Sequence, residues 1–394
     1  MRAIFSSLTR PQPQPHEARL RTATKLTSSI KSYPSPPTAP SSFDIPLLTC
    51  MYKYTLGNIA TAVFGLYVDT FAENDVFFNT TTEMFQAFIK NRKFQFAMLQ
   101  MFPRFSKLAQ IQGIEQKYSD FYWSLLNAAL TARQNGGVKG SDFFQLLVDA
   151  QNEDNPENDK VGKGNKKNIK WTNELACAQA FLFMGAGFAT VANNLAAAMY
   201  ILATEGELQD KVYQEVKDVM GENETISYDD SNKLENAEIL KGFVYTLQVL
   251  RLYPVQSRLE RIAVKDYAVM RSNGKTVIIP KGANIAISAE AVQKDEQYFA
   301  NPLNFDPERF SVENKGKISP YSYLPFGVGP RNCIGMRFAL AETKVLLAHV
   351  VRNFVLSPTK TTRFPSRFQE RRSASKSIWG SRYDSRQEFE ADFV

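Results

Sequence analysis

The chain has 394 residues, of which 44% are hydrophobic and 22% are charged. This balance is ordinary for a globular protein and excludes collagen-like, coiled-coil and wholly disordered classes. The formal net charge is +7, but the excess lies in the two ends: residues 1–49 hold six basic and two acidic groups, and residues 357–394 hold eight and five. Because the middle is neutral, the pI of 9.1 does not by itself predict a nucleic-acid-binding protein.

The first 43 residues predict a disordered leader. They combine seven prolines with a single acid, a composition that buries too little apolar surface to fold. Their charge resembles that of a mitochondrial transit peptide, although the prolines would interrupt an amphipathic helix, and the apolar segment of a secretory signal is not present.

Most of the remaining chain predicts helices, because apolar residues recur at three- and four-residue steps. In chain order, the predicted helices cover residues 54–71, 83–92, 113–134, 142–151, from about 172 onward, 207–220, 227–252 and 336–354. Short strands are predicted at residues 267–270, 276–279 and 284–288, between turns that contain Gly, Asn and Pro. The sequence therefore predicts a mainly α fold with a small β region.

One stretch raises the question of a membrane span. No charge interrupts the chain between Glu174 and Glu205, and a span needs about 20 apolar residues. However, polar residues such as Thr190 and Asn194 punctuate the stretch, and its second half is rich in Ala. We therefore expect a long buried core helix rather than a membrane span.

The most specific signal is the run Pro325-Phe326-Gly327-Val328-Gly329-Pro330-Arg331-Asn332-Cys333-Ile334-Gly335. It places a cysteine where a glycine-rich loop turns into a helix. Backbone N–H groups and the helix dipole at such a place stabilise a thiolate. The other cysteines, Cys50 and Cys177, lie far away and form no CxxC pair, so neither a disulfide framework nor a zinc module is expected.

Three chemistries use such a thiolate. A Cys–His nucleophile is disfavoured, because His349 lies 16 residues along the same predicted helix, about 24 Å from Cys333. A nucleotide-binding loop is disfavoured, because no Gly-Lys-Ser/Thr follows and Asn332 stands where a third glycine is required. An axial metal ligand remains, with glycines that let the backbone approach a flat cofactor and Arg331 for a carboxylate. A buried inert cysteine near a turn would not require this spacing of Phe, Gly and Arg.

This run resembles the signature of the cytochrome P450 family, F-x-x-G-x-R-x-C-x-G, with matches at Phe326, Gly329, Arg331, Cys333 and Gly335. Other stretches similar to the family occur in the same order: Ala186–Thr190, Leu250–Pro254, Arg258–Arg261 and Phe305–Phe310. The chain looks most like the animal clan that holds vertebrate drug-metabolising and insect detoxifying enzymes. The resemblance covers residues 50–356, between the leader, residues 1–49, and a diverged basic tail, residues 357–394.

The resemblance implies a role for each matching residue in the cofactor site. Cys333 would be the proximal ligand of haem iron, where thiolate donation favours O–O cleavage. Arg331 and Arg261 would pair with the haem propionates; the alternative for Arg261 is a surface salt bridge. The other cofactor-binding residues would be Phe326, Gly327 and Gly335.

The resemblance also implies a distal site on the long helix. Thr190 would lie over the distal face and help to relay protons to bound oxygen; the alternative is a core residue that bonds back to a carbonyl. Ala186 and Gly187 would give oxygen room, and Phe183 would meet an apolar substrate.

Three departures from the family pattern bear on activity. Gln248 stands where the family has Glu, which would leave Arg251 and Arg309 without their counter-ion, a loss of a few kcal/mol if they are buried. Ala189 replaces the acid that usually precedes the distal threonine, which weakens the proton relay. The family's membrane anchor, first helices and final hairpin find no match in this sequence.

From the resemblance we expect a haem-dependent monooxygenase that inserts one oxygen atom from O2 into a hydrophobic small molecule such as a xenobiotic, a steroid or a fatty acid. Electrons would come from NADPH through a flavoprotein reductase, with cytochrome b5 as a further partner, and no nucleic acid is expected. The alternative is a catalytically impaired or inactive truncated relative that binds haem. The family implies the endoplasmic reticulum membrane, with the mitochondrion or cytoplasm as alternatives because the anchor is not matched.

Overall fold

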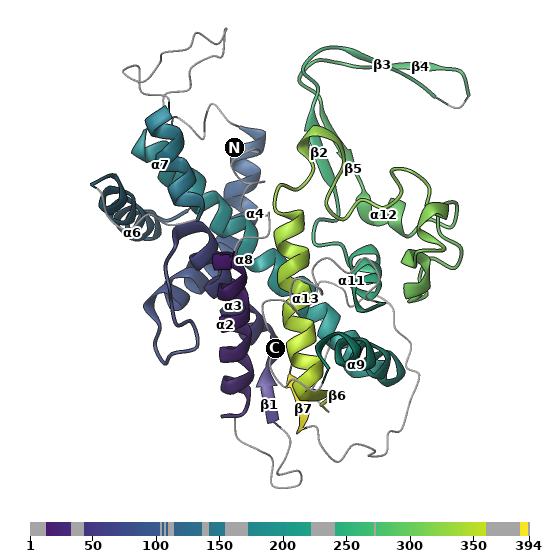
Figure 1. Ribbon diagram of the computed structural model, residues 1–394. Coiled ribbons are helices and arrows are strands. Elements are labelled where there is room, and N and C mark those ends of the chain that lie inside the picture. The colour runs from purple at the N-terminus through teal and green to yellow at the C-terminus, as the bar shows by residue number, and fades with distance from the viewer. Residues whose placement is uncertain are drawn as a thin grey trace.

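A computed structural model of the chain describes residues 13–32, 43–102, 105, 108, 114–135, 142–153, 172–221, 241–271, 273–359 and 387–392. The helices are α2 (Pro13–Ile30), α3 (Leu47–Ile59), the π-helical turn η1 (Ala60–Phe64), α4 (Val76–Met101), α6 (Gln116–Gln134), α7 (Phe143–Glu153), α8 (Asn173–Thr204), α9 (Gly206–Met220), α11 (Lys241–Leu252), α12 (Ala289–Gln293), the 3-10 turns η3 (Pro307–Phe310), η4 (Lys315–Lys317) and η5 (Gly329–Arg331), and α13 (Met336–Asn353). The strands are β1 (Phe43–Pro46), β2 (Leu259–Ile262), β3 (Tyr267–Met270), β4 (Thr276–Ile279), β5 (Asn284–Ile287), β6 (Phe354–Pro358) and β7 (Gln387–Asp392). The predicted mainly α fold with a small β region is confirmed (Figure 1).

Helix α8 runs through the centre of the protein, and its sequence explains this position. Its side chains are apolar on almost every side, which is the pattern of a helix surrounded by protein. Thr172 caps its first turn by accepting a hydrogen bond from the Leu175 N–H at 3.3 Å. Among the described residues, α8 is the helix long and apolar enough to cross a membrane. It contributes buried side chains to both hydrophobic clusters and is therefore a core helix in this structure, as predicted.

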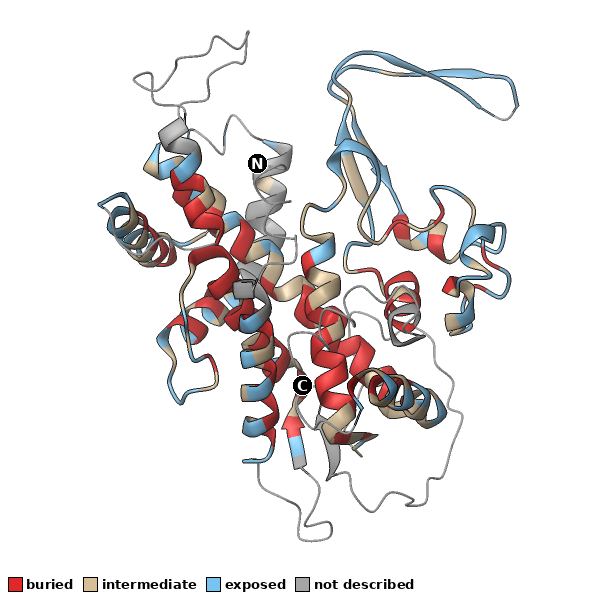
Figure 2. Ribbon diagram, in the orientation of Figure 1, coloured by how far each residue is buried: buried red, intermediate tan, exposed pale blue. Residues whose placement is uncertain are grey.

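The core consists of two hydrophobic clusters that share α8 (Figure 2). The first surrounds the C-terminal half of α8 with side chains from α2, α3, α9, α11, α13 and β6. The second surrounds the N-terminal half with side chains from η1, α4, α6 and α7, together with Phe338 of α13. Helix α3 lies very close to α8, because a Cβ atom at Gly187 would be only 2.6 Å from the Ile59 Cδ1 atom.

The strands form three separate sheets. Strands β1, β7 and β6 form a parallel sheet in that order, in which β7 lies between strands from opposite parts of the chain. Strands β2 and β5 form one antiparallel pair, and β3 and β4 form another. The β3–β4 hairpin turns at Asn273 and Gly274, where Gly274 has a φ of +76°. Figure 1 shows this hairpin projecting away from the helices.

The structure differs from the predicted disordered leader at α2. This helix buries Ala23, Leu26 and Ile30 completely or almost completely against the first cluster. Small and apolar side chains at steps of three and four residues make one narrow face, which is enough to dock a helix although the overall composition is polar. Composition alone therefore did not predict α2. The sequence likewise did not predict β2, or β7 in the tail after residue 356.

Several predicted elements have different limits in the structure. The helix predicted over 54–71 is α3 followed by η1, and it stops at Gly65, whose φ of +64° ends the helical backbone. Helix α4 is longer than the predicted 83–92. The predicted strands 267–270 and 276–279 match β3 and β4 residue for residue. The part of the predicted helix 227–252 that precedes residue 241 lies outside the described residues.

Candidate functional site

The loop before α13 has a backbone that its glycines make possible. Gly327 and Gly329 have φ values of +67° and +75°, a region that other residues rarely adopt. The Cys333 N–H donates to the Phe326 carbonyl at 2.8 Å, which closes the loop on itself. Gly335 then caps α13. The loop therefore holds Cys333 in a fixed position just before the first turn of a buried helix.

The Cys333 sulfur lies in a site with opposing effects on its charge. The residue is exposed to solvent as a whole, but neighbouring atoms desolvate the sulfur, and this desolvation raises the pKa of the thiol. The Gly335 backbone N–H donates to the sulfur and lowers that pKa. Cys177 has no such donor: burial and the nearby Glu174 raise its pKa to about 11. Of these two cysteines, only Cys333 combines access with a donor that stabilises a metal-bound thiolate.

Two arginines lie near this loop without an internal acid. Arg331 and Arg261 are both exposed, and in the described part of the chain neither forms an ion pair. The Arg261 Nη1 donates to the carbonyl of Glu260 at 2.8 Å. Strand β2 approaches the loop, because a Cβ atom at Gly327 would lie 3.7 Å from Leu259 Cδ2. Since alternate residues of a strand share a face, Arg261 lies on the same side of β2 as Leu259.

Helix α8 presents two of its predicted site residues on one face. Ala186 is exposed and Thr190 half-buried, and they are four residues apart. The Thr190 Oγ1 donates to the Ala186 carbonyl at 2.6 Å, which is the back-bonding that the sequence left open. Gly187 lies one residue further round the helix and faces Ile59. The structure thus gives Gly187 a role in packing α3 against α8, and its predicted place beside oxygen stays a prediction.

The Cys333 loop and α8 meet at the second hydrophobic cluster. Ile334, next to Cys333, and Ala189, next to Thr190, both pack against it. The cluster also contains Phe183, which the sequence placed beside a substrate; here it is buried and packs against the tilted ring of Phe143, with ring centroids 4.5 Å apart. The Cys333 loop and the exposed face of α8 therefore both pack on the second hydrophobic cluster.

The predicted ion-pair site is built around a completely buried arginine. The Arg251 Nε donates to Gln248 Oε1 at 2.8 Å, and its two other donors reach the carbonyls of Gln293 at 2.8 Å and Asn304 at 3.2 Å. Gln248 is equally buried and donates to the Asn304 carbonyl at 3.1 Å. Burial, and the charge of nearby Arg309, lower the pKa of Arg251 to about 10. Neutral oxygens thus replace a carboxylate as the partners of Arg251.

Arg309 differs from the sequence expectation, because it has an acidic neighbour. Its Nε lies 3.5 Å from the Asp306 Oδ2, and its Nη2 donates to the Asn301 carbonyl at 3.3 Å. The charge of Asp306 also opposes the lowering of the Arg251 pKa. Sequence reasoning missed Asp306, although its place three residues before Arg309 on a short helical turn was a usable signal.

A buried acid on α13 was also missed. Glu342 of α13 is completely buried, and its Oε1 accepts a hydrogen bond from Asn58 Nδ2 at 2.9 Å. Tyr54 donates to the Glu342 carbonyl at 3.0 Å. Burial raises the pKa of Glu342 to about 8, although Asn58 and the charge of Arg19 lower it. The signal was a carboxylate among the apolar residues of α13, at a position that the helical pattern turns toward the core.

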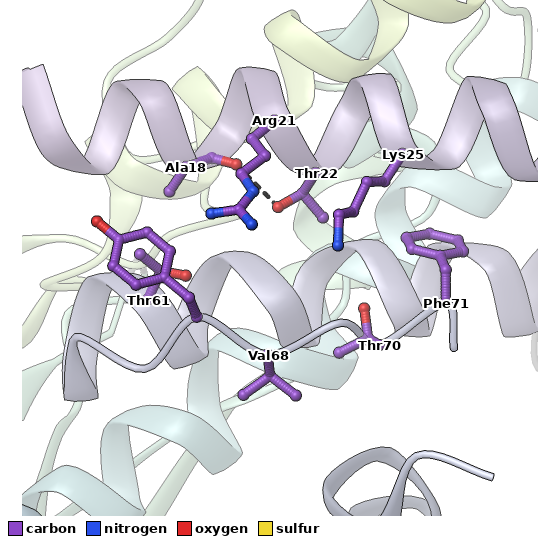
Figure 3. A pocket seen from close by; sticks show the side chains of 9 residues that line it. Ala18, Arg21, Thr22, Lys25, Thr61, Val68, Thr70 and Phe71 are labelled. Atoms are coloured by element: carbon purple, nitrogen blue, oxygen red, sulfur yellow. Dashed lines mark hydrogen bonds between the residues drawn. The ribbon is translucent and has the colours of Figure 1, made fainter. Parts of the chain in front are cut away.

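A pocket between α2 and the segment after η1 is unrelated to the Cys333 loop (Figure 3). Its lining includes three threonines whose hydroxyls all donate to backbone carbonyls, namely Thr22 to Ala18, Thr61 to Gly57 and Thr70 to Lys53. Lys25, which also lines the pocket, forms an ion pair in which its Nζ atom lies 2.5 Å from the Asp69 Oδ2 atom. Because most of its polar groups have partners within the protein, this pocket is not the candidate site.

Comparison with known proteins gives a family match and several similar sequences. The family model described as "Cytochrome P450" matches residues 24–377. Cytochrome P450 3A11 of Mus musculus is 38% identical over 224 residues, which cover 57% of this chain and 41% of that protein. Cytochrome P450 9e2 of Blattella germanica is 32% identical over 323 residues, 79% of this chain and 58% of that protein. Cytochrome P450 3A12 of Canis lupus familiaris is 31% identical over 316 residues, which cover 79% of this chain and 59% of that protein.

These matches, together with the loop and the helical fold, define a haem-thiolate class of protein. The chain belongs to the cytochrome P450 family, as the resemblance predicted. The family uses haem and receives its electrons from a reductase. The chain spans between 41% and 59% of the length of the curated relatives it matches.

Proposed function

We propose that this protein is a haem-thiolate monooxygenase that inserts one oxygen atom from O2 into a hydrophobic small molecule. The observation that carries the proposal is the Cys333 sulfur, which is accessible, fixed by a closed glycine loop and hydrogen-bonded by the Gly335 N–H. The same donor set fits haem: one thiolate for the iron and two unpaired cations for the propionates. Xenobiotics, steroids and fatty acids are the substrate classes that an apolar site admits.

Each residue of the site has a task that follows from its surroundings. Bound haem would supply the oxygen chemistry, and Cys333 would hold the iron. Arg331 and Arg261 would bind the propionates, because charge-assisted hydrogen bonds replace their contacts with water. Ala186 leaves open space on α8. Thr190 directs its proton to the Ala186 carbonyl, so its oxygen lone pairs remain available to accept a hydrogen bond from a water molecule in the site.

The partners and the location follow from the same proposal. Electrons would come from NADPH through a flavoprotein reductase, with cytochrome b5 as a second donor. An apolar substrate and the relatives' family favour the endoplasmic reticulum membrane. The neutral middle of the chain supports a small-molecule enzyme rather than a nucleic-acid-binding protein.

A second function is favoured by one observation. Arg251 is completely buried without a carboxylate within hydrogen-bond distance, and Gln248 is the reason. A loss of a few kcal/mol at this point would loosen Gln293, whose side chain accepts a hydrogen bond from the Leu324 N–H at 2.6 Å just before the Cys333 loop. The alternative is therefore a relative that binds haem but turns over slowly or not at all.

The first experiment tests the thiolate. The full chain is loaded with haem, reduced and treated with carbon monoxide, and its absorption spectrum is recorded. Cysteine ligation predicts a strongly red-shifted main band that Cys333→Ser abolishes and that Cys177→Ala, at a buried cysteine away from the loop, preserves. A red-shifted band in Cys333→Ser, or none in fully loaded wild-type protein, would overturn the assignment of Cys333.

The second experiment separates the two functions. With a flavoprotein reductase, NADPH and a steroid or fatty acid, an active monooxygenase yields hydroxylated product in proportion to NADPH consumed. A normal thiolate spectrum without product in the wild type supports the impaired relative, and product formation excludes it. Thr190→Val should lower the yield of product per NADPH while leaving the thiolate spectrum unchanged, because it removes only the hydroxyl.

A further inference from the structure

The β3–β4 hairpin exposes apolar side chains on both of its faces. Tyr267, Val269 and Val277 lie on one face, and their exposed fractions are 60%, 37% and 37%. Met270 and Ile278 lie on the other, at 77% and 58%. A hairpin with one solvated face alternates polar and apolar residues, whereas this hairpin has apolar side chains on both faces. An isolated two-stranded hairpin is also only marginally stable in water.

The outer edge of β3 is open for pairing. In the described part of the chain β3 pairs only with β4. The Arg271 N–H donates to the Lys275 carbonyl, so odd-numbered residues of β3 bond to β4. The N–H and C=O groups of Ala268 and Met270 therefore point outward. Strand β3 contains no Lys or Pro, the residues that usually protect such an edge, whereas the outer edge of β4 ends at Pro280.

We propose that the β3 edge pairs antiparallel with the β3 edge of a second copy of this chain, forming a two-fold symmetric dimer with one continuous four-stranded sheet. The proposal is independent of the monooxygenase function. Ala268 of each copy exchanges backbone hydrogen bonds with Met270 of the other. Val269 lies on the two-fold axis and faces the same residue of the second copy as a closely spaced non-hydrogen-bonded pair.

Charge selects this register over its neighbour. With the axis at Val269, Arg271 lies across from Tyr267 of the second copy, and a guanidinium next to an aromatic ring is favourable. With the axis at Ala268, Lys265 would lie across from Arg271 of the second copy, and like charges directly opposite destabilise a sheet. Because a two-fold axis duplicates every pair, the favourable Tyr267–Arg271 contact occurs twice.

Sedimentation of the full chain over the micromolar range tests the dimer. We expect the mass to rise with concentration from 44.5 kDa to about 89 kDa, twice the chain mass. A mass that stays at that of one chain overturns the proposal, and so does growth beyond two chains, because one two-fold edge pairing closes the assembly.

Two matched proline variants locate the edge. Ala268→Pro removes an outward N–H from β3, and Ile278→Pro removes one from β4 at the cross-strand partner of Ala268. We expect Ala268→Pro to return the mass to one chain and Ile278→Pro to remain a dimer. Dissociation by Ile278→Pro alone, or by neither variant, contradicts pairing through β3.

A charge-swap pair tests the axis without proline. Val269→Lys and Val269→Glu each place like charges face to face across the two-fold axis, so each alone should sediment as one chain. An equal mixture should form the mixed dimer, because opposite charges then meet. Helical circular dichroism equal to that of the wild type shows that each variant is folded, and a mixture that stays monomeric overturns the register.

Discussion

Arg251 and Arg331 show two opposite ways of placing a guanidinium in one protein. Arg251 is completely buried, and three neighbouring oxygens accept its hydrogen bonds. Arg331 is exposed beside Cys333 and forms no ion pair in the described part of the chain. Both residues match the family, but only one of them has its partners inside the protein.

The difference teaches how structural and ligand-binding residues separate. A buried charge that has lost its partners is costly, so Arg251 must be satisfied by the fold itself. An exposed guanidinium is solvated by water and keeps its donors for a carboxylate that arrives later. We therefore expect substitutions around Arg251 to change the stability of the protein, and substitutions at Arg331 to change the binding of haem.

The largest effect should come from removing the buried guanidinium. Arg251→Met keeps the volume but leaves the buried Gln293 carbonyl and the Gln248 Oε1 atom without the donors they have in the wild type, so we expect a loss of about 2–4 kcal/mol in the free energy of unfolding. Arg331→Met should change it by less than about 0.5 kcal/mol and weaken haem retention instead. Urea unfolding of the haem-free chain and haem transfer measure the two effects. Equal stability losses in both variants would remove the distinction.

The buried acid of α13 extends the comparison to pH. The pKa of Glu342 is about 8 in the folded chain, against an ordinary 4.5, so the folded state holds a proton that the unfolded state releases. Stability should fall as the pH rises through this window and level off above 8. Burial lowers the pKa of His349 from an ordinary 6.5 to about 4. His349 therefore makes the protein more stable as the pH rises from 4 to 6.5, and it adds no pH dependence above 6.5.

Between pH 6.5 and 8, Glu342 is therefore the one of these two groups that titrates. We expect a loss of about 2 kcal/mol across this interval, at roughly 1.4 kcal/mol per pH unit. Glu342→Gln should flatten the profile of unfolding free energy against pH. A slope in Glu342→Gln equal to that of the wild type would assign the pH dependence to other groups.

Restoring a carboxylate beside Arg251 should stabilise the protein modestly. Gln248→Glu converts a neutral hydrogen bond into a charge-assisted one, but it also loses the donor to the Asn304 carbonyl, so we expect a net gain of about 1 kcal/mol and better haem retention. Gln293→Glu is the matched control. Its amide donates to the Leu250 and Arg251 carbonyls, so the same substitution there should destabilise. Thermal unfolding measures both variants: we expect a higher midpoint temperature for Gln248→Glu and a lower one for Gln293→Glu. A lower midpoint for Gln248→Glu would contradict the prediction.

The last prediction concerns the Cys333 loop itself. Gly327→Ala places a side chain at a φ of +67°, which costs about 1–2 kcal/mol. Gly316→Ala is a control in an open site without positive φ, and it should be neutral or slightly stabilising. Because Gly327 shapes the loop that holds Cys333, its variant should also reduce the fraction of haem with a thiolate spectrum. A spectrum unchanged at full loading would show that the loop tolerates the strain.

Much of the site could be predicted from the sequence because the chemistry is local. The Cys333 loop follows from positive-φ glycines and a helix start within eleven consecutive residues, and β3 and β4 follow from alternation around an Asn-Gly turn. Neither prediction needed distant parts of the chain. The family and the mainly α fold were predicted from the same local features.

The parts that could not be predicted depend on contacts between distant residues. Helix α2 docks through a few small side chains that become buried because α13 and α3 pack against them. Glu342 is significant because Asn58, 284 residues away, is its hydrogen-bond donor. The packing role of Gly187 depends on Ile59 of α3, which lies far away in the sequence. Sequence patterns give the face of a helix but not the identity of its neighbour.

The parallel sheet of β1, β7 and β6 has a consequence for how the chain folds. Its central strand, β7, is the last element described, and both of its neighbours precede it in the sequence. Pairing Phe43 with Phe389 closes a loop of nearly the whole chain, and contacts of such long range form slowly. During synthesis the middle strand leaves the ribosome after both of its neighbours, so β1 and β6 keep open edges until β7 emerges.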